Sequence, residues 1–486
     1  MEKTLSLKKN FIFNLATQIL NLVVPLITTP YLARVLHETG NGQYSYAYSI
    51  ITYFILFANL GFNYYGQREI ARTRDDKYQM SKVFWEIFIL RTICSVISFG
   101  TIISIVFTVG FGEKYNMLIL ILSMQVLGSM FDILFYFQGN ENFKAIAIRT
   151  IVIKILGLVA VFVFVKEESD VWIYALCLSI ITVASNLIMW PSVLRKINFV
   201  KLSQLGLAKH IKPTIMIFLP TLAVTVYSVF DKTMIGMLSP NPDYDNGCYE
   251  QAYKINSIGV IFPVLITTIL GPRNAYEYQK GNLEAMEENI RFSIKYVWML
   301  GLPLIAGFAV LSPSISFWFL GDGYIEVPLL LQIMSVRFVL SGMGEILSNQ
   351  IFIVIGKEKY STIGTTVAAV TNVCLNFVLI PILGAVGASI TTAVSEFVVF
   401  LILFILAVKS NFIQIKFFIV SSFKYLLSAL AMFALIYFVQ SCMDYSVWTF
   451  LLITLIGGTI YFFILIILKE EITISTIRKV IKALGR

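Results

Sequence analysis

The sequence predicts an all-α protein that crosses a membrane about fourteen times. We expect two six-helix lobes, related by a pseudo-two-fold axis around a central cavity, and two further helices at the C-terminus. Three observations support this fold class: the composition, the lengths of the apolar runs and an internal repeat. Of the 486 residues, 58% are hydrophobic and 13% are charged, and the mean hydropathy is +0.81. Soluble proteins carry about twice that charged fraction, so the composition indicates a membrane protein.

Apolar runs of membrane-crossing length define the expected helices. A helix needs about 20 mainly apolar residues to cross the hydrocarbon core of a bilayer. The first run follows Lys8-Lys9, is too long for the apolar part of a signal peptide and lacks a small-residue cleavage site, so we expect an uncleaved span. The predicted spans are residues 11–36, 43–65, 83–109, 117–138, 145–165, 171–190, 213–238, 252–272, 293–319, 328–354, 362–383, 386–408, 417–440 and 446–468.

The distribution of positive charge supports this number of spans. With the N-terminus inside, 28 of the 37 lysines and arginines lie in the inner segments, and only Lys114 and Lys166 lie in outer loops. Cytoplasmic loops collect lysine and arginine, and one miscounted helix would reverse every later loop. The sequence therefore predicts a multi-pass protein of the cytoplasmic membrane with both termini in the cytoplasm.

Two short motifs occur twice, in the same order and at nearly the same offset. The pattern N-G-x-Y-x-x-A-Y-x-I occupies residues 41–50 and 246–255, and G-x-E-[NK]-[FY] occupies residues 139–143 and 356–360. Spans one to six therefore correspond to spans seven to twelve, as parallel repeats. The predicted regions are an N-terminal lobe (1–195), a cytoplasmic linker (196–212), a C-terminal lobe (213–410), and spans 13 and 14 with a basic tail (411–486). The tail from residue 472 has the spacing of an amphipathic helix.

Twelve charged residues lie within or at the rim of the apolar runs. A charge at mid-bilayer costs roughly 2.5–3.5 kcal/mol on the insertion scale, so these residues predict a polar interior. Their net charge is positive, which suits an anionic ligand such as a pyrophosphate diester. The cations, all candidates for lining a substrate cavity, are Arg34, Arg91, Arg149, Lys154, Lys232, Lys254 and Arg337, and the acids are Glu86, Asp132, Asp231, Glu345 and Glu396.

In the first lobe, Asp132 and Arg149 flank one short loop at similar depth. A structural ion pair between them is the simpler expectation, although Arg91 is an alternative partner for Asp132. Lys154 lies about 7–8 Å deeper than Arg149 along the helix. No acid at its depth is evident from the sequence, which makes Lys154 the better candidate for contacting an anion.

In the second lobe, the side chains of the neighbours Asp231 and Lys232 point about 100° apart on a helix, so at least one of them faces a partner or the cavity. Asp231, Glu345 and Glu396 are candidates for coupling transport to a proton or cation, with structural pairing as the alternative for each.

For Lys254 and Arg34, near the outer ends of their spans, snorkelling to the membrane surface is the alternative to substrate contact. Prolines interrupt the hydrogen bonding of several spans and are candidate gate or kink positions, with simple packing as the alternative. They are Pro25, Pro30, Pro220 and Pro263.

Several classes of function lack their signals. The five cysteines form no metal or disulfide motif, and the two histidines are far apart, so we expect no metal, no cofactor and no catalytic residues. The net charge of +9 is scattered over loops rather than gathered in a patch, which argues against nucleic acid as a partner. No phosphate-binding loop is present, which argues against direct drive by ATP.

Four stretches resemble a known family. They are TTPYLARVL (residues 28–36), GQREIAR (66–72), YFQGNE (136–141) and DKTMIG (231–236). Together they are similar to the Wzx-type flippases of bacterial surface-polysaccharide synthesis, which move O-antigen or capsule repeat units and belong to the MOP/MATE-like superfamily. The similarity extends over nearly the whole chain.

The resemblance implies an activity. We expect translocation of an undecaprenyl-pyrophosphate-linked oligosaccharide to the outer leaflet by alternating access. Membrane lipids, a polysaccharide polymerase and a chain-length regulator are the other expected partners. Carried over by position, the residues that would line the cavity are Arg34, Asp231, Lys232 and Lys254.

Three alternatives remain open. A MATE-type cation-coupled drug antiporter would favour acids in the first lobe, whereas the deep charges here are mostly basic. A MurJ-type lipid II flippase would carry more arginines in spans one and two. A membrane polymerase or glycosyltransferase would need a large outer loop with catalytic residues, and the longest one here, 239–251, has no recognisable pair of catalytic acids.

Overall fold

The computed structural model describes the backbone of residues 2–410, 412, 414–475 and 478. The side chains of residues 2–19, 21–22, 219–221, 223–224 and 226–228 are outside the description. Every regular element in the described residues is helical, and the contacts divide the chain into two compact units, residues 1–236 and 237–486. The expected all-α fold is confirmed. Most of the predicted basic tail lies outside the described residues.

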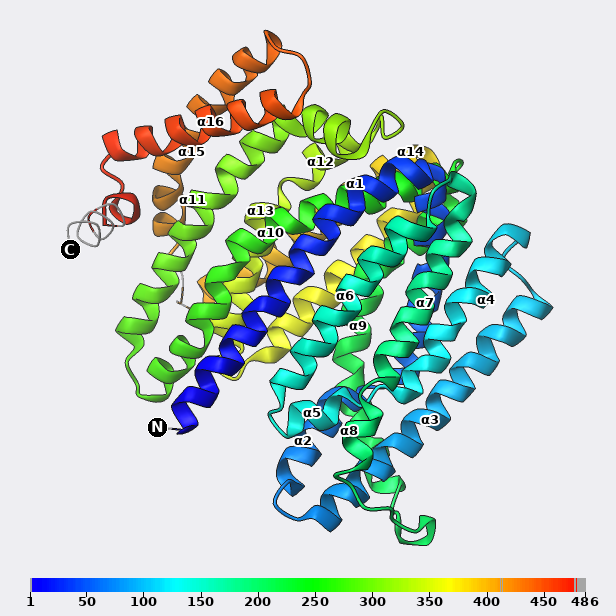
Figure 1. Ribbon diagram of the computed structural model, residues 1–486. Helices are drawn as coiled ribbons and strands as arrows, with labels where there is room; N and C mark the ends of the chain where they lie inside the picture. The colour runs from blue at the N-terminus through cyan, green and yellow to red at the C-terminus, as the bar shows by residue number, and fades with distance from the viewer. Residues whose placement is uncertain (1, 411, 413, 476–477, 479–486) are drawn as a thin grey trace. The chain divides into compact units, whose positions relative to one another are not determined.

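Unit 1 contains helices from α1 to α9 (Figure 1). Its elements are α1 (Glu2–Asn59), α2 (Phe62–Thr73), α3 (Lys77–Thr108), α4 (Glu113–Gly128), η1 (Ser129–Phe131), α5 (Leu134–Gly139), α6 (Phe143–Phe164), η2 (Glu168–Asp170), α7 (Val171–Leu187), α8 (Trp190–Leu194), η3 (Leu202–Gln204) and α9 (Ala208–Leu238), of which the last two residues fall beyond the unit boundary.

Unit 2 contains the remaining helices. Its elements are α10 (Pro242–Gln279), α11 (Leu283–Ile315), η4 (Ser316–Leu320), α12 (Val327–Met334), α13 (Arg337–Glu345), η5 (Ile346–Phe352), α14 (Glu358–Lys409), α15 (Ile415–Ser441) and α16 (Val447–Ile467).

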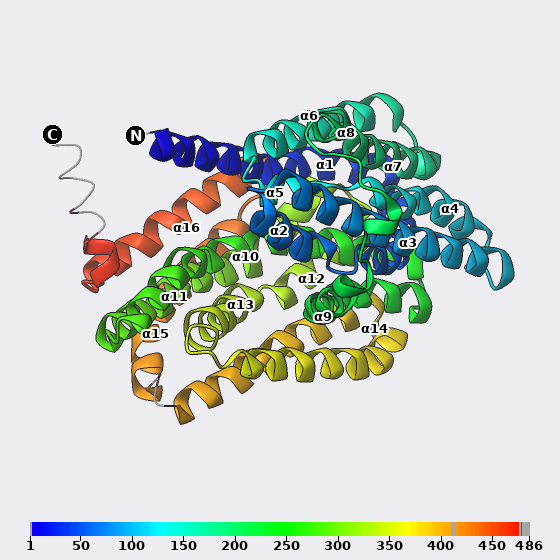
Figure 2. The same ribbon diagram turned by 90° about the horizontal axis from the view of Figure 1, so that it is seen from below.

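Eleven segments of the described residues are long and apolar enough to cross a membrane. Two of them each contain two predicted spans, because α1 and α14 reverse direction at sharp kinks without losing their helical bonding. The kinks lie at His37 (φ 52°) and Gly384 (φ 53°). Figure 2 shows the two halves of α14, and Thr391 in one half bonds to Asn376 in the other. Adding α9, these helices account for the fourteen predicted spans.

Helix α9 packs closely against the second half of α1. The Thr233 hydroxyl lies 2.9 Å from Ser49 Oγ and 3.0 Å from the Tyr53 hydroxyl. A Cβ atom at Gly236 would lie 2.0 Å from the Tyr46 ring, so only glycine permits this approach. These contacts explain why α9 belongs to unit 1 up to Gly236, whereas the sequence repeat groups its span with the later ones. The lobe boundaries from the repeat stay a prediction.

The proline positions do not coincide with the sharpest bends. Pro25 and Pro30 lie inside α1, and the non-helical residue of that helix is His37, seven positions after Pro30. Pro263 lies buried inside α10, where it is next to Gly342. The side chain of Pro220 is outside the described residues. A gating role for these prolines stays a prediction.

Candidate functional site

The fourth membrane segment of unit 1 is interrupted. Helix α4 passes into η1, and Asp132 then adopts an extended backbone before α5 begins. Such a break frees main-chain carbonyls, which need partners inside a membrane. Three side chains supply them: Asn186 donates to the Gly128 carbonyl at 3.0 Å, Trp190 to Phe131 at 2.9 Å, and Arg91 to Asp132 at 2.7 Å.

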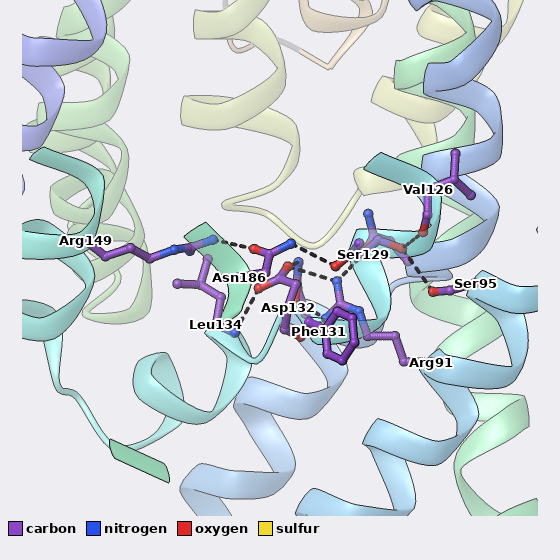
Figure 3. Close-up of polar contacts among 12 residues, drawn as sticks. Arg91, Ser95, Val126, Ser129, Phe131, Asp132, Leu134, Arg149 and Asn186 are labelled. Carbon is purple, nitrogen blue, oxygen red and sulfur yellow. Dashed lines mark hydrogen bonds and ion pairs between the residues drawn. The ribbon is translucent and has the colours of Figure 1, made fainter. Parts of the chain in front are cut away.

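Arg91 lies at the centre of this network (Figure 3). Its guanidinium pairs with the Asp132 carboxylate at 2.9 Å and donates to the side chains of Asn63, at 2.9 Å, and Asn59. The Arg91 side chain is fully buried, and that of Asp132 is 17% exposed. The Leu134 amide also donates to the carboxylate, at 3.0 Å. The positive charge of Arg91 is therefore already matched within unit 1.

Arg149, on α6, reaches α7 instead of Asp132. Its Nε donates to the carbonyl of Ser185 at 3.0 Å and to its hydroxyl at 2.8 Å, and another guanidinium nitrogen donates to the Asn186 side chain. Figure 3 shows Arg149 and Asn186 joined by this bond, and Asn186 in turn donates to the Gly128 carbonyl. Of the two partners considered for Asp132, the structure pairs it with Arg91, and Arg149 forms no ion pair among the described residues.

Lys154 also lies on α6 and is half-buried. In the described part of the chain, no hydrogen bond or ion pair engages its ammonium group. The membrane window of α6 is 11% buried within the protein, the lowest value of the eleven candidate spans. Thus α6 carries two membrane cations that form no ion pair among the described residues, on the candidate span with the smallest buried share.

Unit 2 repeats the interrupted segment between α12 and α13. There, Asn256 donates to the freed Met334 carbonyl at 3.0 Å, and Arg337 donates to Asn256 at 2.9 Å. Arg337 also pairs with Glu396 at 3.3 Å, and its guanidinium lies 4.8 Å from the centre of the Tyr253 ring. An arginine paired with a carboxylate and an asparagine thus stabilises the break in both units.

The other candidates in unit 2 are engaged differently. Glu345 accepts a hydrogen bond from Asn349, and no ion pair to it is found among the described residues. Lys254 pairs with Glu250 at 3.0 Å, one helical turn away, so its charge is balanced locally.

The remaining predicted residues of unit 1 lie apart from the Arg91 network. Arg34 is exposed on α1 and donates to the Pro30 carbonyl at 3.3 Å. Asp231 is 4% exposed on α9, and its neighbour Lys232 is half-buried. Among the described residues, no interaction joins Asp132 to Arg34, Asp231 or Lys232.

The sequence did not indicate one buried polar cluster. Glu86, which is fully buried on α3, accepts from the Gly206 amide at 2.7 Å and pairs with Lys209 at 2.8 Å. His210 Nε2 lies 2.7 Å from Glu86, and its Nδ1 lies 2.6 Å from the Tyr65 hydroxyl. One feature of the sequence could have predicted this cluster. Glu86 lies in an apolar run, and a carboxylate buried there needs hydrogen-bond donors from other parts of the chain. The cluster attaches the start of α9 to α2 and α3.

Known proteins share this fold and part of this sequence. A protein of Escherichia coli strain K12 with the provisional name O-antigen transporter is 24% identical over 398 residues, which cover 81% of this chain and 94% of that protein. A Haloferax volcanii protein with the provisional name low-salt glycan biosynthesis flippase is 25% identical over 169 residues, 35% of each chain.

A solved structure extends the comparison to nearly the whole chain. The lipid II flippase MurJ, in an inward closed conformation, superposes with a TM-score of 0.77 at 15% identity, covering 95% of this chain and 99% of the other. At that identity the likeness establishes the fold. The resemblance predicted from the short motifs is therefore confirmed for both fold and family. The chain belongs to the family described as polysaccharide biosynthesis protein, whose model matches residues 7–273, more than half of the sequence.

Proposed function

We propose that this multi-pass membrane protein is a flippase for lipid-linked oligosaccharide repeat units in surface-polysaccharide synthesis. Its substrate would be an undecaprenyl-pyrophosphate-linked glycan, moved from the inner to the outer leaflet of the bacterial cytoplasmic membrane by alternating access. The family and the names of the relatives support the substrate class. The observation that carries the proposal within this chain is the pair of cations on α6.

A pyrophosphate diester carries two negative charges, which must be matched when it leaves water. Arg91, Arg337 and Lys254 each contact a carboxylate already, so a substrate would have to displace an existing partner. Arg149 and Lys154 would not need such an exchange. Arg149 is held by neutral groups on α7, and Lys154 lies on a span with little cover from its own unit.

We propose Lys154 as the first contact for the diphosphate and Arg149 as the second, with Arg34 and Lys232 as further candidates along the path, whereas Lys254 stays paired with Glu250. Charge-assisted contacts to phosphate are about twice as strong as neutral hydrogen bonds. Among the coupling candidates, Glu345 is favoured over Glu396, because the carboxylate of Glu396 is paired with Arg337. Asp231 stays a candidate for coupling.

The test is a transport assay with purified protein in liposomes. Fluorescent undecaprenyl-pyrophosphate sugars are placed in one leaflet, and their arrival in the other is followed by quenching. Wild-type protein should accelerate transfer, and Lys154→Gln should slow it. Transport of lipid II alone would favour a MurJ-type substrate, and transport of cationic dyes alone would favour a drug antiporter.

A further inference from the structure

A pocket of about 410 Å³ lies on the loop formed by the first copy of the G-x-E-[NK]-[FY] motif. Its lining comes from the end of α5, the start of α6 and the chain just after α8. These three helices belong to unit 1 and are labelled in Figure 1. The proposed transport path makes no use of this motif. The residues that line the pocket are Tyr136, Phe137, Asn140, Glu141, Asn142, Phe143, Lys144 and Lys196.

The pocket contains two cations that the protein leaves unmatched. Lys144 and Lys196 are exposed, and neither has an ion pair or a side-chain hydrogen bond in the described part of the chain. The single acid in the lining, Glu141, is paired with Arg74 at 3.1 Å. The pocket therefore has a net positive charge that favours an anion.

The loop around the pocket is held in a defined shape. The amides of Asn140, Glu141 and Asn142 donate back to the end of α5, and Glu141 has a positive φ of 55°. At Gly139, an added Cβ would lie 2.7 Å from Ile70 and 2.8 Å from the Gln67 carbonyl, so the loop lies directly on α2. The two lysines thus extend from a preformed frame, which lowers the entropic cost of binding.

The two asparagines leave one hydrogen-bonding group each for a ligand. Asn142 accepts from the Ala145 amide through Oδ1, so its NH₂ group stays available as a donor. Asn140 donates from Nδ2 to the Tyr136 carbonyl, so its side-chain oxygen stays available as an acceptor. A donor and an acceptor beside two ammonium groups match a phosphate that carries hydroxyl groups.

The second copy of the motif carries two lysines, and both lie near an aromatic ring of the same motif. Lys357 and Lys359 lie 5.9 and 5.6 Å from the centre of the Tyr360 ring, within range of cation–π attraction. The corresponding aromatic residue in the first copy, Phe143, lines the pocket. Lys357 and Lys359 occupy the repeat positions of Asn140 and Asn142, and they serve as a control pair of lysines on the other copy of the motif.

We propose that this pocket binds the phosphate of a hydroxyl-bearing headgroup, and that Lys144 and Lys196 contact the phosphate. The loops that carry both lysines are predicted to face the cytoplasm, where the leaflet is rich in anionic phospholipid, and basic pockets at this surface suit such headgroups. A soluble phosphate would offer the same chemistry. The site does not include Arg149 or Lys154, which lie further along α6, and it does not depend on which substrate is transported.

The test uses the full chain in phosphatidylcholine nanodiscs. Dihexanoylphosphatidylglycerol is titrated in one arm and inorganic phosphate in the other, and the dissociation constant is measured for each. The variants are the Lys144→Ala/Lys196→Ala double variant and the control Lys357→Ala/Lys359→Ala. The thermal midpoint without added ligand shows whether each variant is folded, and Lys144→Gln and Lys196→Gln serve as milder single variants.

The double variant should bind at least about tenfold more weakly, because both cations that match the charge of the phosphate are removed. The control should bind like the wild type, and each single variant should lose part of the affinity. A loss seen only with the phosphatidylglycerol identifies a lipid site, and a loss seen also with inorganic phosphate identifies a site for soluble phosphates. Equal affinity of the double variant and the wild type, or an equal loss in the control, would overturn the proposal.

Discussion

The guanidinium of Arg91 bonds to Asp132 twice, to the carboxylate at 2.9 Å and to the main-chain carbonyl at 2.7 Å. One arginine thereby balances a buried charge and also satisfies the backbone at the break between η1 and α5. Arg337 has a comparable role in unit 2, although it lies on the broken segment itself, and Asn256 links it to the freed Met334 carbonyl. The broken segment in each unit is therefore stabilised by an arginine side chain, and diverting that arginine to a ligand would leave the break without its partner.

Arg91→Ala should strongly destabilise the protein. It would leave the Asp132 carboxylate and carbonyl without their principal donor, and removing one partner of a buried pair costs about 3–5 kcal/mol. The measurement is the unfolding of purified protein by denaturant in detergent. The matched control is Arg68→Ala, because Arg68 is 46% exposed in its pair with Glu69, and such pairs contribute about 1 kcal/mol or less. Equal effects of the two variants would contradict the structural role of Arg91.

The two partners of the Glu86–Lys209 pair should respond very differently to removal. Glu86→Ala should destabilise by several kcal/mol, because the buried His210 ring and the Gly206 amide both lose their acceptor. Lys209→Ala should cost less than about 1 kcal/mol, since the Lys209 side chain is 53% exposed. The same unfolding experiment compares them, and a larger loss for Lys209→Ala would show that Glu86 is not held as described.

Lys154→Gln should reduce transport by roughly ten- to a hundredfold, if one charge-assisted contact of about 1.5–3 kcal/mol is lost. Its thermal stability should not fall, because no described contact depends on the ammonium group. The matched control is Lys254→Gln, whose cation is already paired with Glu250, and its transport rate should change much less. Normal transport by Lys154→Gln would exclude this lysine as a substrate contact.

Glu470, which follows α16, should make stability depend on pH. Burial disfavours its ionised form, but donors from the Thr473 and Ile472 amides and the Tyr425 hydroxyl outweigh this and lower the pKa of Glu470. A lowered pKa in the folded state stabilises the protein above the unfolded value of about 4.3, and this contribution is lost as the pH falls through the folded value.

The wild type should therefore lose more stability between pH 6 and pH 3 than Glu470→Gln does, while the variant should be the less stable protein at pH 6. Thermal unfolding of both proteins at the two pH values measures the difference. The same change in both proteins would show that Glu470 does not contribute to the pH dependence.

The helices could be predicted from the sequence because membrane crossing imposes a length of apolar chain that local composition reveals. The kinks could not be predicted in the same way. The predicted spans end beside both kinks, but the composition there does not reveal that helical bonding continues through His37 and Gly384. The interruption at Asp132 was also hidden, since the residues around the break are mostly apolar.

The partners of the buried charges depend on tertiary packing. Arg91 and Asp132 are 41 positions apart, and Arg337 and Glu396 are 59 positions apart. For Asp132 the sequence offered two possible partners, and for Arg337 it indicated none. The lack of a counter-ion near Lys154 was inferred because no acid lies at its depth on neighbouring spans, and the described residues agree with that inference. His210 was missed because a lone histidine at the start of a span carries no local pattern.

The central claim is that this chain moves a pyrophosphate-linked glycan lipid between leaflets, with α6 supplying the unmatched cations. The most direct test is the transfer of a fluorescent undecaprenyl-pyrophosphate oligosaccharide in proteoliposomes containing the wild type, Lys154→Gln or Lys254→Gln. The account predicts rapid transfer by the wild type and Lys254→Gln and a severe loss with Lys154→Gln. No transfer by folded wild-type protein, or equal rates for all three proteins, would contradict it.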